Sequence, residues 1–342
     1  MRESSLTIKP LVGWGILGTG AIARSFVRDL MLLSHARIAA VGSRSLDSAR
    51  AFAHAHPCDG HTPRAYGSYE EMSEDPGVDI VYVATPHSMH FENVQMCLNA
   101  GKPVLCEKAF ALNAAQTQQM MRLAAAKELF LMEAMWMRCN PVIRQLRDVA
   151  LGGAIGDVRQ VTADLSFEPA QPTKNRLYDP ELGASALLDI GIYPVTFASL
   201  ILGGPAGVAA WADLSDRGVD VNTGVTLGYT SGAVAALTCS MTARSSNVAT
   251  VSGTRGRIDI PARFHHPSRF TLHHDGTSQT YETQLRGTGL SYEAEEAQRC
   301  LREGLRESPL VPLADTLSVM TVLDSIRAEI GVTYQADVDA PT

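Results

Sequence analysis

The sequence predicts an α/β fold in two domains, a doubly wound parallel sheet followed by an α+β domain with a large open, mainly antiparallel sheet. Strand-like and helix-like segments alternate between residues 11 and 134, which is typical of a parallel sheet covered by helices. A glycine-rich turn joins the first strand to the first helix. After residue 141 the pattern changes to β-type runs separated by glycine-rich turns. We therefore expect domains at 1–135 and 136–342.

The first domain should contain six strands with helices between them. The run VDIVYVATP is continuously apolar and β-branched, as expected for a parallel strand buried on both faces. Ser68, followed three residues later by Glu71, forms a capping box that predicts the start of a helix. The expected strands are 11–17, 37–45, a short piece at 65–66, 78–86, 103–106 and 129–134, and the expected helices are 21–33, 46–56, 68–75, 88–100 and 113–127.

The second domain should be built on strands that are mostly antiparallel. Its expected strands are 157–167, 207–214, 223–230, 233–243 and 247–252, and its expected helices are 185–202, 292–305 and 312–331. The last helix is expected to pack back on the first domain.

Composition excludes several classes of protein. The chain has 342 residues, a net charge of -7, and hydrophobic and charged contents of 45% and 19%, which are ordinary globular values. A negative chain without basic clusters argues against binding to nucleic acid. We find neither a secretory leader nor an apolar stretch of about 18 residues, so we expect no membrane span and a cytoplasmic location. Six scattered cysteines predict free buried thiols, and no metal site is predicted.

The glycine-rich turn predicts a dinucleotide site and a Rossmann fold for the first domain. The motif G-x-G-x-x-A is formed by Gly18, Thr19, Gly20, Ala21, Ile22 and Ala23. Gly18 permits the tight turn, and Gly20 lets the backbone approach a pyrophosphate at the positive end of the helix. A nicotinamide dinucleotide is the favoured ligand, and FAD is a second option.

The end of the second strand favours NADP over NAD. Sites for NAD usually carry an acidic residue there, which binds the ribose 2′-hydroxyl. This chain has Ser43 and Arg44 instead, and a guanidinium suits a 2′-phosphate. A solvated loop arginine is the alternative reading of Arg44.

The segment VATPHSMH follows the fourth strand, at the edge of the sheet where ligands bind. Ala84, Thr85 and Pro86 are expected to form a turn against the cofactor. His90 is either a second cofactor contact or a core histidine of the next helix.

Five segments together resemble one family. They are the Gly18 motif, VATPHSMH, CEKAF, EAMWMR and ALLDIGIYPV. The chain is similar over nearly its whole length to the glucose-fructose oxidoreductase/inositol dehydrogenase (Gfo/Idh/MocA) family, and most to its branch of dimeric dihydrodiol dehydrogenases and NADP-dependent D-xylose dehydrogenases. The resemblance implies a homodimer that meets through the open sheet.

The resemblance also implies a role for the charged pair Glu107 and Lys108 at the end of the fifth strand. The family has an E-K-P motif here, whose lysine reaches the substrate hydroxyl and the nicotinamide ribose. Ala109 stands in place of the proline, so packing must hold the backbone at Lys108. A structural ion pair between Glu107 and Lys108 is the alternative.

Asp189 and Tyr193 match the family pattern D-x-x-x-Y and, four residues apart on a helix, share one face. Tyr193 is the expected acid or base, Lys108 polarises the substrate oxygen and favours the phenolate, and Asp189 orients Lys108 or a second hydroxyl. An ordinary half-buried aromatic is the alternative for Tyr193.

Four further residues are expected near the cofactor or the substrate by resemblance. Trp136 should line the pocket, or else pack at the hinge, and Arg138 should contact the cofactor side. Phe167 and Arg176 are weaker substrate candidates.

Two functions fit these residues. The first is an NADP-dependent oxidoreductase that acts on a cyclic polyol, either an aldose such as xylose or glucose, or a trans-dihydrodiol. The second is a non-catalytic protein of the same fold that senses NADP(H). The joint presence of Lys108, Asp189 and Tyr193 favours the enzyme. A redox-neutral reaction with a tightly held cofactor is a third option.

Overall fold

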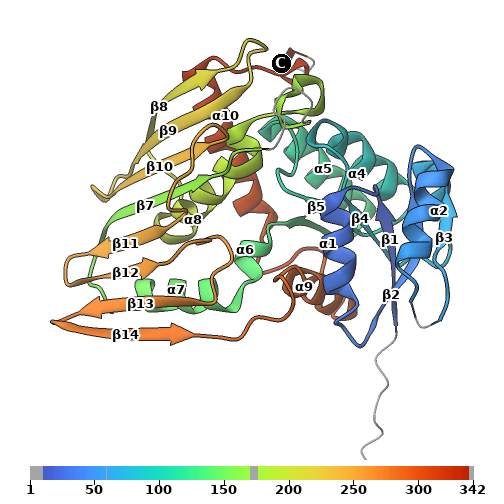
Figure 1. The fold of residues 1–342 in the computed structure, drawn as a ribbon, viewed down its shortest axis with the longest axis horizontal. Coiled ribbons are helices and arrows are strands. Elements are labelled where there is room, and N and C mark those ends of the chain that lie inside the picture. The colour runs from blue at the N-terminus through green and yellow to red at the C-terminus, as the bar shows by residue number, and fades with distance from the viewer. Residues whose placement is uncertain (1–10, 59, 170–175, 339–342) are drawn as a thin grey trace, which may run out of the picture.

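The computed structural model describes residues 11–58, 60–169 and 176–338, which form two sheets (Figure 1). The first sheet is parallel, with the strand order β3-β2-β1-β4-β5-β6 of a Rossmann fold. Its strands are β1 (Val12–Leu17), β2 (Ala36–Gly42), β3 (Arg64–Tyr66), β4 (Ile80–Val83), β5 (Val104–Glu107) and β6 (Leu131–Ala134).

The helices of the first sheet begin where the sequence predicts. They are α1 (Ala21–Leu30), α2 (Leu46–Ala55), α3 (Tyr69–Ser73), α4 (His90–Asn99) and α5 (Ala114–Lys127). The predicted cap of α3 is confirmed, because the Ser68 hydroxyl accepts the backbone N–H of Glu71 at 3.1 Å. Asn113 caps α5 in the same way, accepting the N–H of Gln116 at 2.8 Å.

The second sheet has the order β14-β13-β12-β11-β7-β10-β9-β8, and all of its pairs are antiparallel except β7 with β10. The strands are β7 (Val158–Ser166), β8 (Gly207–Leu214), β9 (Asp220–Gly228), β10 (Val234–Ser240), β11 (Ala249–Gly253), β12 (Gly256–Ile260), β13 (Arg269–His274) and β14 (Thr277–Glu282). The expected mainly antiparallel sheet is confirmed. The sequence did not predict β12, β13 and β14, whose polar segments lack an apolar run.

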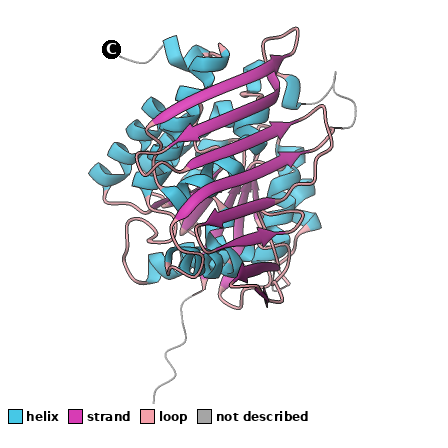
Figure 2. Ribbon diagram, turned by 90° about the vertical axis from the view of Figure 1, so that its left-hand side faces the viewer, coloured by secondary structure: helices cyan, strands magenta, loops and turns pink. Residues whose placement is uncertain are grey.

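Helices cover one face of this sheet and leave the other open. The remaining helices are α6 (Trp136–Cys139), α7 (Pro141–Leu151), α8 (Ile192–Leu202), α9 (Ser291–Arg302), α10 (Leu313–Ile330) and α11 (Gln335–Val338). Helix α8 packs on β7 and β10, and α10 packs on β8 and also on α5 of the first sheet. Figure 2 shows the strands with their open face toward the viewer and the helices behind them.

The segment Pro180–Leu202 corrects one expectation. It is a helical stretch, long and apolar enough to cross a membrane by length and composition, where no such stretch was expected. Its most apolar window is 83% buried inside the protein. This burial is the property of a core helix, and α8 indeed packs between the second sheet and α10.

Helix α8 is preceded by a π-helical turn, Leu187–Gly191. The turn is fully buried, and Asp220 accepts the N–H of Leu187 at 2.7 Å. It faces the carboxyl ends of β1, β4 and β5, where the strand order of the first sheet reverses. Ligands of doubly wound sheets bind at this position.

Candidate active site

A cleft of about 610 Å³ lies between the first sheet and the π-helical turn. Sixteen residues predicted from the sequence line it: Gly18, Thr19, Gly20, Ala21, Ile22, Ser43, Arg44, Ala84, Thr85, Pro86, Glu107, Lys108, Trp136, Arg176, Asp189 and Tyr193. The first sheet contributes the phosphate-binding motif and Lys108, and the second domain contributes Asp189 and Tyr193. The cleft therefore brings both halves of the predicted site together.

The turn before α1 has the shape that a pyrophosphate requires. Gly18 has a φ of 103°, and a Cβ there would lie 2.9 Å from the carbonyl oxygen of Ala84. A Cβ on Gly20 would meet no described atom within 4 Å, so its backbone faces open space. No side chain caps the N-terminus of α1, which leaves backbone N–H groups available to an anion. The described residues thus fit a dinucleotide.

The rim beside β2 carries Ser43, Arg44 and Tyr69. The Arg44 guanidinium lies beside the hydroxyl of Tyr69, and it makes no ion pair with any described carboxylate. A positive charge without an acidic partner at this rim suits a phosphate ligand.

Lys108 is held by Asp189. Its Nζ donates to the backbone oxygen of Asp189 at 2.7 Å and lies 3.5 Å from the carboxylate Oδ1. The Arg176 guanidinium is 3.7 Å from the same oxygen. Burial alone would raise the pKa of Asp189, but the charges of Lys108 and Arg176 hold it below its usual value. The carboxylate is therefore ionised at neutral pH and orients Lys108, one of the two roles expected for it.

Tyr193 is hydrogen-bonded to Trp136, whose indole N–H donates to the Tyr193 hydroxyl at 2.6 Å. The Nζ of Lys108 lies 5.3 Å from the centroid of the Tyr193 ring, over its face. Burial raises the pKa of Tyr193 well above 10, and the bond from Trp136 opposes this shift. Tyr193 therefore carries its proton at neutral pH, the form required for the acid role that is one of its two expected roles.

Glu107 is buried behind Lys108. It accepts hydrogen bonds from the Tyr82 hydroxyl and, at 3.2 Å, from the backbone N–H of Lys108. Burial raises the pKa of Glu107, while the nearby Lys108 ammonium opposes the rise. These contacts fix the backbone at the start of the Lys108 side chain.

His90 supports the turn that contains Ala109. Its two ring nitrogens lie 2.8 Å from the Ala109 oxygen and 2.9 Å from the Thr85 oxygen. Ala109 itself is fully buried, and its peptide bond to Lys108 is cis. Burial lowers the pKa of His90 to about 4, so the ring is neutral. Packing and His90 hold this turn, as the replacement of proline by alanine requires.

Three of the predicted residues do not line the cleft. His90 is fully buried beneath it, as the core histidine that was one of its two readings. Arg138 pairs with Asp315 and donates to the Leu310 oxygen at 2.9 Å, so its charge is used outside the cleft. Phe167 follows the end of β7 and is 37% exposed outside the cleft.

Five lining residues were not predicted from the sequence: Ser25, Tyr69, His87, Thr288 and Leu290. His87 lies in the same TPHSMH segment as Pro86, so its place in that turn was a usable signal. Its Nε2 is 3.9 Å from Asp189, and burial lowers its pKa to about 3.

Two more aromatic rings lie beside the cleft. His266 stacks on Trp136 with 4.8 Å between ring centroids, and His265 lies 4.9 Å from the Tyr193 ring. Burial lowers the pKa of His265 to about 3 and that of His266 to about 4, so both rings are neutral. Together with Trp136 and Tyr193, these two rings form an aromatic cluster beside the cleft.

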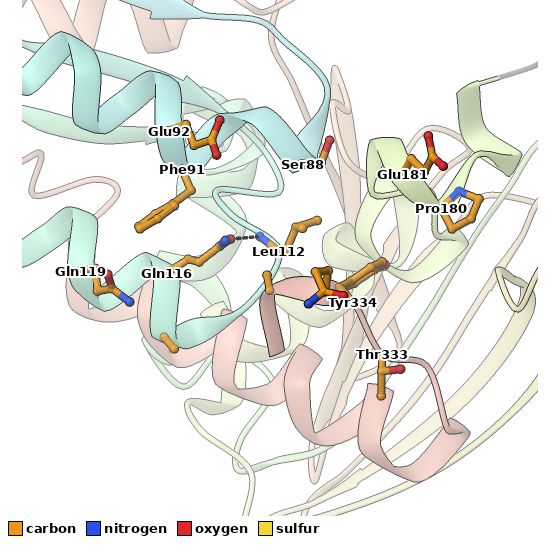
Figure 3. A pocket seen from close by; sticks show the side chains of 13 residues that line it. Ser88, Phe91, Glu92, Leu112, Gln116, Gln119, Pro180, Glu181, Thr333 and Tyr334 are labelled. Carbon is orange, nitrogen blue, oxygen red and sulfur yellow. Dashed lines mark hydrogen bonds between the residues drawn. The ribbon is translucent and has the colours of Figure 1, made fainter. Parts of the chain in front are cut away.

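A second cavity, of about 570 Å³, lies between α4, α5 and the segment before α11 (Figure 3). Glu92, Glu181 and Gln116 border it. None of its described lining residues is Lys, Arg or His, so the cavity offers no positive charge to hold a phosphate. The cleft that contains Lys108 is therefore the candidate active site.

Both domains match one family. Residues 12–135 match the oxidoreductase family with an NAD-binding Rossmann fold, and residues 143–259 match the GFO/IDH/MocA C-terminal domain. The trans-1,2-dihydrobenzene-1,2-diol dehydrogenase of Xenopus tropicalis is 38% identical over 334 residues, which cover 94% of this chain and 98% of that relative. The enzyme of the same name from Homo sapiens is 37% identical, covering 95% and 98%.

Solved structures agree with this assignment. A 3-ketoreductase from Actinomadura kijaniata in complex with NADP and TDP-benzene is 26% identical, with a TM-score of 0.83, and covers 94% of this chain and 98% of its own. An aldose-aldose oxidoreductase from Caulobacter crescentus, complexed with glycerol, is 25% identical, with a TM-score of 0.84 and coverages of 93% and 97%. The chain therefore belongs to the GFO/IDH/MocA oxidoreductase family, as a nicotinamide-dependent dehydrogenase or reductase of CH–OH groups.

Proposed function

We propose that the protein is an NADP-dependent oxidoreductase that moves a hydride between the nicotinamide and a hydroxyl or carbonyl carbon of a cyclic polyol. The substrate class is an aldose such as xylose or glucose, or a trans-dihydrodiol. The observation that carries the proposal is the placement of Lys108, Asp189 and Tyr193 in the same cleft as the phosphate-binding turn. The names of the relatives, dihydrodiol dehydrogenases and sugar oxidoreductases, support both substrate classes.

The proton chemistry follows from the protein's own groups. When bound, a nicotinamide dinucleotide supplies or takes up the hydride. Tyr193 holds its proton at neutral pH and is suited to donate it to a carbonyl oxygen in the reducing direction. The Lys108 ammonium contacts the backbone oxygen and the carboxylate of Asp189. Because an ammonium has three N–H donors, one of them remains for the substrate oxygen.

The opposite direction requires Tyr193 to lose its proton first. The indole N–H of Trp136 stabilises the resulting phenolate by a hydrogen bond, and the Lys108 ammonium over the ring stabilises it by charge. Asp189 keeps the ammonium in place, because it is ionised and buried beside it.

The preference for NADP rests on Arg44. It lines the cleft at the end of β2, beside Ser43, where an NAD site would carry an acidic residue. A guanidinium makes charge-assisted hydrogen bonds to a phosphate.

A homodimer through the open sheet is part of the proposal. The outward residues of β9 and β10 are uncharged, and Trp211 of β8 is 85% exposed on this sheet. A large exposed apolar side chain beside uncharged outward residues is typical of a subunit interface. We also propose a cytoplasmic location, because all six cysteines are free thiols, which suits a reducing compartment.

The deciding experiment follows the nicotinamide absorbance of purified protein with NADP⁺ or NAD⁺ and a panel of aldoses, inositols and dihydrodiols. We expect NADPH to form with one substrate class. We expect Tyr193→Phe to lower kcat by about 10²- to 10⁴-fold with little change in cofactor affinity. The matched control is Tyr229→Phe, which removes a buried hydroxyl that has no described partner.

Two results would count against the proposal. Full turnover by Tyr193→Phe would remove this tyrosine from the mechanism. No net NADPH with any substrate, together with cofactor that stays bound through gel filtration, would favour the redox-neutral reaction.

A further inference from the structure

The segment RGTGL, residues 286–290, reaches the cleft from a part of the chain far from the Rossmann domain. It follows β14 and precedes α9, outside the two regions that match the family. Thr288 and Leu290 nevertheless line the cleft. The question is what holds this partly exposed segment against a site built by residues between Gly18 and Tyr193.

Asp29, in the last turn of α1, holds it. The two carboxylate oxygens of Asp29 accept the Thr288 N–H at 3.1 and 2.9 Å, and Oδ2 also accepts the N–H groups of Gly289 at 3.0 Å and Ser291 at 3.2 Å. Asp29 is 2% exposed. An acid near the C-terminus of a helix opposes the helix dipole, so α1 itself gains nothing from this carboxylate. The described hydrogen bonds of the carboxylate all go to this segment and to Ser291, the first residue of α9.

The two glycines of the segment allow these contacts. Gly287 has a φ of 60°, and a Cβ there would lie 2.5 Å from Oδ1 of Asp29. Gly289 has a φ of 107°, and its Cβ would touch the Trp136 ring at 3.3 Å. Either substitution would strain the backbone and push the segment away from Asp29 or from Trp136.

The contact with Trp136 places the segment at one end of the cleft. The indole N–H of Trp136 donates to the hydroxyl of Tyr193. Gly289 lies against the six-membered ring of the same indole. Arg44, the proposed partner of the 2′-phosphate, lines the cleft next to β2 instead. Thr288 therefore lies on the side of the reacting ring rather than on the side of the adenosine.

We propose that residues 287–290 complete the dinucleotide site: the Thr288 hydroxyl binds the nicotinamide half of the cofactor, and Asp29 is the positioning residue that holds the segment in place. The inference rests on the proposed function, because it needs a nicotinamide dinucleotide in the cleft. The Thr288 hydroxyl has no partner among the described residues and both donates and accepts. It suits the ribose hydroxyls or the carboxamide of that half.

The first test compares the whole cofactor with its adenosine half. NADPH binding is measured by its fluorescence, with NADH as the alternative, and adenosine 2′,5′-bisphosphate is measured by displacement. We expect Thr288→Val to weaken binding of the reduced cofactor by about 3- to 10-fold, the loss of one hydrogen bond, and to leave the bisphosphate unchanged. Thr280→Val, on the exposed strand β14, is the matched control.

The second test replaces the anchor. Asp29→Asn keeps the volume of the side chain but removes its charge. We expect the affinity for the reduced cofactor to fall about tenfold and the affinity for the bisphosphate to stay unchanged. Asp164→Asn is the control, because Asp164 similarly accepts the N–H groups of Asn247 at 2.6 Å and Val248 at 3.3 Å, far from the cleft. Asp164→Asn should lower the stability of the protein without changing its affinity for the cofactor or for the bisphosphate.

Each outcome decides one claim. Unchanged cofactor binding in Thr288→Val overturns the inference, and so does an equal loss for cofactor and bisphosphate in both variants. A wild-type protein that binds neither NADPH nor NADH overturns the proposed function itself, and the inference with it.

Discussion

The hydrogen bond from Trp136 to Tyr193 acts directly on the pKa of the hydroxyl that is proposed to transfer the proton. Burial and the nearby carboxylates of Glu107 and Asp189 push the pKa of Tyr193 upward, and the indole N–H opposes them. A tryptophan expected only to line the pocket or to pack at the hinge thus also acts on the tyrosine by hydrogen bonding.

Trp136→Phe should therefore change the pH dependence of the reaction. The variant keeps an aromatic ring but loses the N–H, so the pKa of Tyr193 rises further. We expect the rising limb of kcat against pH in the oxidising direction to move up by about one unit, the value of one hydrogen bond.

Trp14→Phe is its control, because the buried indole N–H of Trp14 has no described partner. An unchanged pH profile in Trp136→Phe would mean that the bond does not tune the tyrosine.

Arg44 should decide the choice of cofactor. We expect Arg44→Ala to raise the KM for NADP⁺ by about 10- to 100-fold through the loss of charge-assisted hydrogen bonds, and to leave the KM for NAD⁺ nearly unchanged. Steady-state kinetics with both cofactors measure this. Arg50→Ala, an exposed arginine of α2 that pairs with Asp47, is the control. Equal increases for both cofactors would contradict the assignment.

Among the elements, β6 carries a titratable group with a measurable consequence. Burial raises the pKa of Glu133 to about 7, although the Thr316 hydroxyl of α10 donates to it at 2.9 Å. The unfolded value is near 4.5. Below this value both states are protonated and the group has no effect on stability. Between about pH 4.5 and 7 the unfolded chain has lost this proton while the folded protein still keeps it, so stability falls across this window, and the loss is complete once the pH has passed 7.

Glu133→Gln mimics the protonated form and should remove this fall. From the difference between the two pKa values, we expect the variant to gain about 3 kcal/mol over the wild type on going from about pH 5 to pH 8. Urea unfolding at the two pH values measures it, with the exposed Glu282→Gln as control. The same difference between variant and wild type at both pH values would disprove the shift.

Sequence patterns predicted well where a local signal existed. The turn at Gly18, the lysine after β5 and the spacing of Asp189 and Tyr193 are short-range features, and all of these residues line the cleft. Strands β12 to β14 were missed because their sequences are polar and they form only by pairing with a preceding strand.

The Asp29 anchor shows the other limit. Nothing local to Asp29 or to Thr288 indicates the other, because 259 residues separate them and the link is through backbone N–H groups. Arg138 shows that a local motif can also mislead when the partner of a side chain lies far along the chain. Its place in a recognised motif suggested the cofactor, but Asp315, far along the chain, takes its charge.

At the scale of the whole molecule, the open sheet predicts the assembly. We expect the wild type to be a dimer and Trp211→Glu to be a monomer, because the change replaces an exposed apolar side chain by a charge beside the uncharged outward residues of β9. Sedimentation or light scattering measures the mass. Leu151→Glu alters a 57% exposed apolar residue of α7, away from this face, and should leave the mass unchanged. A dimeric Trp211→Glu would place the interface elsewhere.

The π-helical turn Leu187–Gly191 makes the molecule sensitive to chain length at one place. A π-turn holds one residue more than an α-helix would need over the same span. Deleting one residue there would leave a regular helix, still apolar and able to pack. If the lost residue lay between Asp189 and Tyr193, Asp189 would be displaced by one position, about 100° around the helix axis, from its present contact with Lys108. In evolution, the gene can accept substitutions along this helix that preserve its packing, but it must keep the number of residues between the aspartate and the tyrosine.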